Sequence, residues 1–136
     1  MTMLDTAVLS EAECWSLLDT QTVGRIAFVR DGHVELLPLN YRVSNGGIVI
    51  RTSLSSPLAA LCDGVDEVAF EADYHDDLYQ RGWSVVITGR GRTAEPDDVR
   101  PEDLRRLNAW AHGERPLLAR IDPVSVTGRR VEIGAR

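Results

Sequence analysis

The sequence predicts a mainly β protein, a small antiparallel barrel with short helices at its corners. Apolar and polar residues alternate with a period of two along most of the chain. Tight turns such as Asp31-Gly32 and Asn45-Gly46 separate the alternating runs. A doubly wound sheet would need helices alternating regularly with parallel strands, and this order of elements does not occur.

The elements can be placed in chain order. Residues 1–9 are expected to form a flexible lead-in, and residues 10–136 a single domain. Ser10 and Glu13 form a capping box for a helix that ends near Thr20. Two further helices are expected, at 57–63 and 98–112. Six or seven strands are expected, drawn from 23–30, 33–43, 47–50, 67–73, 83–93, 117–121 and 126–133, with a polar loop at 74–82.

Composition excludes several classes of partner. The chain has 136 residues and a formal net charge of −6, which argues against a nucleic-acid backbone as the main ligand. No apolar run approaches the ~18 residues of a membrane helix, and the first residues do not resemble a signal peptide. We therefore expect a cytoplasmic protein without a membrane partner, in which Cys14 and Cys62 are reduced.

A hydroxyl-rich segment after one predicted strand is the strongest candidate for a ligand site. Arg51 is followed by Thr52 and three serines, and then by a helix start with Ser56 as its N-cap and Pro57 in the first turn. Unpaired N–H groups and a guanidinium both favour a phosphate, so the segment predicts a phosphate site. The alternative is a capped surface helix with Arg51 facing solvent.

Several short patterns together resemble the pyridoxamine 5'-phosphate oxidase-like, FMN-binding split-barrel family, over Ser10 to Ile133. These patterns are Gly24-Arg25-Ile26-Ala27-Phe28, Pro38-Leu39-Asn40-Tyr41, Ile50-Arg51-Thr52, Val68-Ala69-Phe70-Glu71-Ala72-Asp73, Gly82-Trp83-Ser84-Val85-Val86 and Val126-Thr127-Gly128-Arg129-Arg130. The resemblance implies a six-stranded, Greek-key split barrel that forms a homodimer, with two flavin sites between the subunits.

The resemblance also implies roles for individual residues. The segment around the phosphate would use Arg51, Thr52, Ser55 and Ser56. The strand along the isoalloxazine ring would contribute Pro38, Leu39 and Asn40. Trp83 and Ser84 would approach the flavin from the partner subunit, and Trp110 would lie near its edge. Tryptophans at these two positions are equally compatible with core or interface packing.

One departure from the family pattern concerns the phosphate. Many relatives carry a glycine-threonine-lysine sequence after the arginine loop, whereas this chain has Ser55-Ser56-Pro57. Losing a charge-assisted hydrogen bond of ~1.5–3 kcal/mol would weaken FMN binding roughly tenfold to a hundredfold. A deazaflavin in place of FMN, or an empty site, therefore remains open.

The resulting functional hypothesis is a flavin-dependent oxidoreductase that acts on a small-molecule substrate, with a nicotinamide as a possible electron donor. The alternatives are a non-catalytic flavin or deazaflavin binding protein and a degenerate barrel with an empty site. No side chain is assigned as catalytic, because the flavin would carry the chemistry. No metal site is expected, since consecutive residues such as those at 74–77 rarely converge on one ion. Glu71 and Asp73 are expected to form an ion-pair ladder with Arg90 and Arg92.

Overall fold

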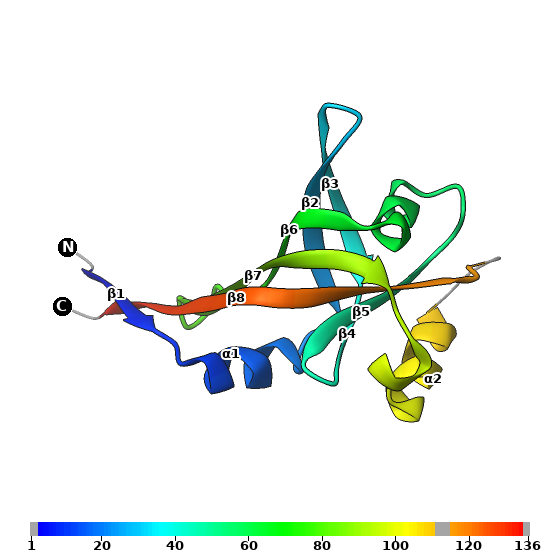
Figure 1. The fold of residues 1–136 in the computed structure, drawn as a ribbon. Helices are drawn as coiled ribbons and strands as arrows, with labels where there is room; N and C mark the ends of the chain where they lie inside the picture. The colour runs from blue at the N-terminus through cyan, green and yellow to red at the C-terminus, as the bar shows by residue number, and fades with distance from the viewer. Residues whose placement is uncertain (1–2, 111–114, 135–136) are drawn as a thin grey trace.

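The computed structural model describes residues 3–110 and 115–134, and its architecture is mainly β, as predicted (Figure 1). The helical elements are α1 (Glu11–Leu18), η1 (Pro57–Asp63), η2 (Pro96–Asp98) and α2 (Pro101–Trp110), of which η1 and η2 are 3-10 helices. The strands are β1 (Met3–Val8), β2 (Val23–Arg30), β3 (His33–Asn40), β4 (Arg42–Ser44), β5 (Gly47–Thr52), β6 (Val65–Asp76), β7 (Arg81–Thr93) and β8 (Leu117–Gly134).

The strands form one antiparallel sheet that curls into a half-open barrel. Its order is β3-β2-β6-β7-β8-β5-β4, and β1 pairs with β8. β3 and β4 lie at opposite ends of this order, yet a single residue, Tyr41, separates them along the chain. The two ends of the sheet must therefore approach each other, which closes one side of the barrel.

The strand boundaries differ from the predicted ones in several places. Met3–Val8, expected within a flexible lead-in, form β1 against the end of β8. The run 33–43 is divided at Tyr41, and the last two predicted strands are one continuous strand, β8. Alternation alone could not show these pairings, because each depends on a partner strand far away in the sequence.

The predicted loop at 74–82 is mostly a hairpin. β6 continues to Asp76 and β7 begins at Arg81, and these two residues are opposite each other in the ladder. The Asp76 carboxylate accepts hydrogen bonds from the amides of Leu78 and Tyr79, at 3.1 and 3.2 Å, which fixes the turn. The residues here are mostly exposed, so no apolar alternation marked the strands.

Two of the helices, α1 and η1, pack against the inner side of the sheet. α1 begins with the predicted capping box, in which the Ser10 hydroxyl accepts from the Glu13 amide at 3.1 Å. Cys14 of α1 lies directly over Gly128, and Leu61 of η1 lies directly over Gly91. A Cβ atom at either glycine would come within 2.7 Å of these side chains, so the absence of a side chain there allows the close approach.

The core fills the inner side of the sheet. Phe70 and Tyr41 are fully buried and meet edge to face, with ring centroids 4.9 Å apart. The Tyr41 hydroxyl donates to the carbonyl of Leu18 at 2.6 Å, which satisfies the one polar atom of that side chain. Burial raises the pKa of Tyr41 well above its usual value, so the hydroxyl stays protonated.

The outer side of the sheet has two unlike halves. α2 and η2 cover β4, β5 and the adjoining part of β8, where Arg42 and Arg120 are nearly buried. The outer side of β3, β2, β6 and β7, which we call the open face, has no covering element among the described residues. Val34, Leu36 and Val29 are 74%, 67% and 62% exposed on this face.

Candidate functional site

Arg51 lies near the end of β5, beside α2. Its Nε donates to the side-chain oxygen of Asn108 at 2.6 Å, and its Nη1 donates to the backbone carbonyl of Arg115. Both acceptors are neutral, and within 3–110 and 115–134 no carboxylate pairs with Arg51. The guanidinium is therefore held in one orientation while its positive charge remains available to an anion.

The predicted hydroxyl segment leads directly into the 3-10 helix η1. Ser56 caps η1 by accepting from the Leu58 amide at 3.2 Å, and the hydroxyls of Ser53 and Ser55 are 3.2 Å apart. Thr52 is fully buried, and its hydroxyl has no hydrogen-bond partner among the described residues. An unpaired buried hydroxyl costs about 1–3 kcal/mol, so it marks a place where the isolated fold is not fully satisfied.

The serines and Arg51 do not line a common cavity. Ser55 and Ser56 line a cavity of about 400 Å³ together with Arg30 and Asp31, which belong to the β2–β3 turn. Arg51 is not among the residues that line it. The phosphate residues implied by the resemblance are thus divided between α2 and the β2–β3 turn within one chain.

Pro38 and Asn40 lie on the open face, whereas Leu39 points to the other side of β3. Pro38 is paired with Arg25 across the β2–β3 ladder, and Asn40 is paired with Val23. Leu39 is half-buried against the core, so only its main chain could meet a ligand on the open face. β3 is an edge strand, where a proline costs no ladder hydrogen bond if its nitrogen faces outward.

Trp83 and Ser84 lie on opposite sides of β7. Ser84 shares the open face, between Asp73 and Arg129 in the ladders of the neighbouring strands. Trp83 points to the inner side, where it packs against the core. Trp110 ends α2, and its side chain lies outside the described residues. The side chains of Trp83 and Ser84 therefore cannot both contact one ligand from the same chain.

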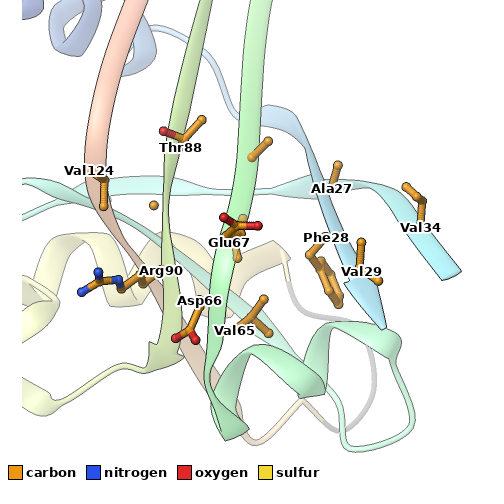
Figure 2. Close-up of a pocket in the computed structure, with 13 residues that line it drawn as sticks. Ala27, Phe28, Val29, Val34, Val65, Asp66, Glu67, Thr88, Arg90 and Val124 are labelled. Atoms are coloured by element: carbon orange, nitrogen blue, oxygen red, sulfur yellow. The ribbon is translucent and has the colours of Figure 1, made fainter. Parts of the chain in front are cut away.

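A groove of about 880 Å³ runs across the open face (Figure 2). Its walls are largely apolar, with Ala27 and Val34 on one side and Val124 on the other. Arg90, Asp66 and Glu67 form its polar end. An apolar groove with a polar rim on a sheet face is typical of a surface that is covered by another molecule.

Arg25, Glu71 and Asp73 form a charged cluster beside this groove, and their ion pairs differ from the predicted ones. The Arg25 guanidinium lies 2.8 Å from Asp73 and 3.6 Å from Glu71. Partial burial, and next the neighbouring Asp73 carboxylate, raise the pKa of Glu71 to about 7, against the opposing effect of Arg25. The expected ladder with Arg90 and Arg92 is wrong, because β6 residues 71 and 73 face residues 86 and 84 of β7.

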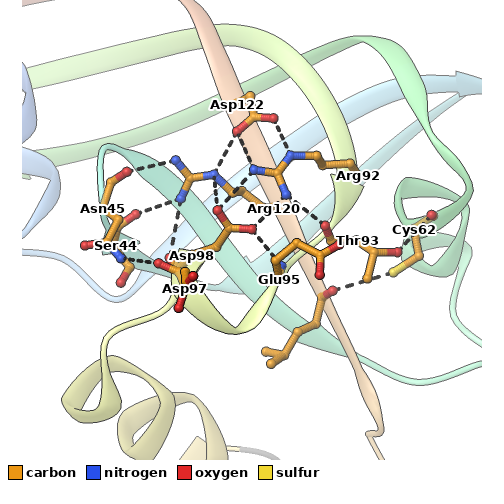
Figure 3. A network of polar contacts seen from close by, with 11 residues as sticks. Ser44, Asn45, Cys62, Arg92, Thr93, Glu95, Asp97, Asp98, Arg120 and Asp122 are labelled. Atoms are coloured by element: carbon orange, nitrogen blue, oxygen red, sulfur yellow. Dashed lines mark hydrogen bonds and ion pairs between the residues drawn. The ribbon is translucent and has the colours of Figure 1, made fainter.

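Arg92 belongs instead to an ionic network on the covered half (Figure 3). It pairs with Asp98 at 2.7 Å and with Asp122 at 2.5 Å, and Arg120 also lies 2.7 Å from Asp122. Hydrogen bonds from Arg92 lower the pKa of Asp98 to about 2. Arg120 donates further to the carbonyls of Ser44 and Asn45 at 2.9 Å. This network fixes η2 to the sheet and leaves no charge free for a ligand.

The described residues hold no cluster suited to a metal ion and no membrane-spanning helix. No group of three or more His, Cys, Asp or Glu side chains there could hold a metal ion. None of the helices described is long and apolar enough to cross a membrane. Both cysteines are free, Cys14 buried and Cys62 half-buried.

Fold and comparisons together define the class of protein. The curled antiparallel sheet with short helices is the architecture of the split-barrel proteins. Solved structures of flavin-binding proteins share this fold. Residues 10–130 match the family model described as pyridoxamine 5'-phosphate oxidase. The chain belongs to this family.

Three relatives illustrate the similarity. The chain is 31% identical to an uncharacterized protein of Mycobacterium tuberculosis over 133 residues, 94% of this chain and 87% of that protein. It is 30% identical to the FAD binding protein of Mycobacterium smegmatis, with a TM-score of 0.68 over 93% of this chain and 98% of that one. A FAD-binding protein of Mesorhizobium loti, 23% identical, shares the fold with a TM-score of 0.73 over 92% and 97% of the two chains.

Proposed function

We propose that the protein is a homodimeric, flavin-dependent oxidoreductase whose cofactor lies between the protomers. The observation that carries the proposal is Arg51, a guanidinium oriented by two neutral oxygens and paired with no carboxylate among the described residues. The 30% identical relative from Mycobacterium smegmatis is a FAD binding protein, which supports a flavin as the ligand.

The residues present fit a flavin nucleotide in chemistry. Arg51 would bind the phosphate, and the exposed hydroxyl of Ser55 lies on the same segment, whereas the unpaired hydroxyl of Thr52 is buried on the inner side of β5. Ser56 would hold the segment in place by capping η1. Pro38, Asn40 and Ser84 would face the ring system from the open face. When bound, the flavin would supply hydride or electron transfer, while these residues bind and orient it.

A second copy of the chain is needed to complete this site. Within one chain, Arg51 lies beside α2, Ser55 and Ser56 lie beside the β2–β3 turn, and Pro38 and Ser84 lie on the open face. The open face carries exposed valines and a leucine around its groove, as expected of a surface that pairs with its own copy. Pairing through this face would bring residues of both protomers around one ligand.

The form of the flavin follows from the same segment. Pro57 stands where many relatives have a lysine, so Arg51 alone would neutralise the phosphate. FMN remains the first candidate, and FAD and a deazaflavin are the others. FAD would gain additional contacts through its adenylate half, which would offset a weakly held phosphate.

The missing lysine also favours a second candidate function. A protein that binds a flavin or deazaflavin without turning over a substrate would need only the residues just described. A barrel with an empty site would need none of them. Absorption spectra separate the three: a yellow protein bleached by a reduced nicotinamide is an enzyme, and a yellow protein indifferent to it is a binder. Colourless protein that takes up no added flavin would show the site to be empty.

Mass spectrometry of the extracted ligand and titrations with FMN, FAD and a deazaflavin test the cofactor directly. Arg51→Ala should raise the dissociation constant at least about tenfold, since a charge-assisted hydrogen bond is lost. Arg30→Ala is the matched control, because Arg30 lines the cavity of Ser55 and Ser56 instead. An unchanged affinity in Arg51→Ala would refute the phosphate assignment. A weakened affinity in Arg30→Ala would place the phosphate at the cavity of Ser55 and Ser56 instead.

A further inference from the structure

β6, β7 and β8 extend beyond the barrel toward the chain termini (Figure 1). A further cavity lies in this extension. Its volume is about 360 Å³. It is lined by Tyr74, Arg81, Gly82, Trp83, Arg130 and Glu132. Two aromatic rings and two guanidinium groups thus surround one small space.

Strand pairing explains why these side chains share a face. Trp83 is opposite Tyr74 in the β6–β7 ladder and opposite Arg130 in the β7–β8 ladder. The next row in the same direction pairs Arg81 with Glu132. Because alternate residues of a strand point to the same side, the rings and guanidiniums face the inner side of this extension.

Among the described residues, the two guanidiniums of this cavity have no close carboxylate partner. Within 3–110 and 115–134, the Arg130 guanidinium makes no hydrogen bond or close ion pair. It lies near the Glu13 carboxyl, whose pKa is lowered by hydrogen bonds with Ser10 and, to a smaller extent, by Arg130. Arg81 lies over the ring of Tyr79, 5.0 Å from its centre, and forms no ion pair with a carboxylate in the described part of the chain. Glu132 is the single acidic residue of the lining, while Glu13 lies near Arg130 and Asp76 is opposite Arg81 in the β6–β7 ladder. An anion would therefore be held by the unpaired guanidinium N–H groups rather than by an excess of positive charge.

We propose that this cavity binds a planar aromatic anion, with the ring against Trp83 and Tyr74 and the carboxylate or phosphate on Arg130 and Arg81. Indole and phenol faces stack on planar rings, and guanidinium groups bind carboxylate and phosphate in a fork. A volume of about 360 Å³ lies at the small end of ligand sites, so it fits one ring system with one anionic group rather than a dinucleotide.

This site goes beyond the proposed flavin function. Trp83 and Ser84 lie on opposite sides of β7, so the cavity is separated from the open face by the sheet itself. Its ligand is therefore a substrate, a product or a regulator, and binding does not require the flavin. The two sites can be tested independently.

Calorimetric titration of the dimer, as purified and after saturation with flavin, tests the proposal. The probes are adenosine monophosphate against adenosine, and 1-naphthoate against 1-naphthalenemethanol, so that each anion has a neutral partner with the same ring. At least one anion should bind about tenfold or more tightly than its neutral partner. Which pair responds distinguishes a nucleotide from an aromatic carboxylate.

Two variants assign the binding to this cavity. Arg130→Gln should weaken the anion about tenfold and leave the neutral ring unchanged. Arg129→Gln is the matched control, since the adjacent exposed arginine projects to the other side of β8. The proposal is overturned if neither anion is preferred, if both variants weaken binding equally, or if saturation with flavin abolishes it.

Discussion

The two halves of the outer sheet surface use the same kinds of residue for different purposes. On the covered half, the guanidiniums of Arg92 and Arg120 are shared between Asp98 and Asp122, and backbone carbonyls take the remaining donors. On the open face, Arg25 lies between Glu71 and Asp73 beside an exposed apolar groove. The first arrangement satisfies its charges within one chain, and the second does not.

This difference shows which half is complete in the monomer. The Asp98 carboxylate is hydrogen-bonded and charged, with its pKa lowered by Arg92. Glu71 has one buried oxygen without a hydrogen-bond partner among the described residues, and its pKa is raised by partial burial. A satisfied network stabilises a fold, whereas an unsatisfied carboxyl beside exposed valines supports the interface proposed for this face.

The largest loss of stability should come from removing a residue of the ionic network on the covered half. Arg120→Met leaves the carbonyls of Ser44 and Asn45 without donors and removes one guanidinium from two aspartates. The free energy of unfolding should fall by about 3 kcal/mol, measured by denaturant titration. Arg90→Met, on the open part of β7, should change it by about 0.5 kcal/mol or less. Equal losses would show that the two halves do not differ in this way.

A charge introduced on the open face should weaken dimerisation without changing the stability of the monomer. Leu36→Asp places a carboxylate on an exposed position, so the monomer should fold normally while the dimer weakens about a hundredfold. Sedimentation at several concentrations measures this change. Leu78→Asp is the control, because Leu78 is 82% exposed at the tip of the β6–β7 hairpin, away from the groove. A Leu36→Asp dimer as tight as the control would place the interface elsewhere.

Caps and turns were more predictable from the sequence than the ion pairs of either half. The helix at Ser10, the turn at Asp31-Gly32 and the cap at Ser56 follow from local hydrogen bonding, and all three are present. The ion pairs were not predictable, because they depend on register: Asp73 is opposite Ser84 rather than an arginine, and its partner is on β2. Local rules identify turns and caps, whereas long-range pairing decides which charges meet.

The candidate site shows the same limit. Period-two alternation could have shown that Trp83 and Ser84, or Pro38 and Leu39, point to opposite sides of their strands. The partner of Arg51 had no such signal, since Asn108 belongs to α2 and reaches β5 only in the folded chain. The site residues were named from a resemblance, and their division over three regions appears only in three dimensions.

Asn108 should affect flavin affinity, because it holds Arg51 in its orientation. Asn108→Ala removes the acceptor of Nε, so the guanidinium keeps its charge but loses its fixed orientation. Flavin affinity should fall about tenfold or less, a smaller loss than in Arg51→Ala, with the fold intact by circular dichroism. Arg105→Ala, an exposed change on the same helix, should leave the titration unaltered. If Asn108→Ala binds flavin normally, Arg51 is not positioned by α2 for this purpose.

The smallest predicted effect is a change of folding stability with pH. It has opposite signs for Glu71 on the open face and Asp98 on the covered half. Because the pKa of Glu71 is raised to about 7, the folded protein binds a proton there between pH 4.5 and 7 that the unfolded chain has released. Stability should therefore fall as pH rises through this window, and Glu71→Gln should flatten the fall and gain about 1 kcal/mol or less above it. Asp98, with its pKa lowered to about 2 from 3.8, gives the opposite sign, since its contribution is lost as pH falls below 3.8. Thermal unfolding across both windows measures the two slopes, and a Glu71→Gln variant that keeps the wild-type slope would show that this carboxyl is already charged in the folded protein.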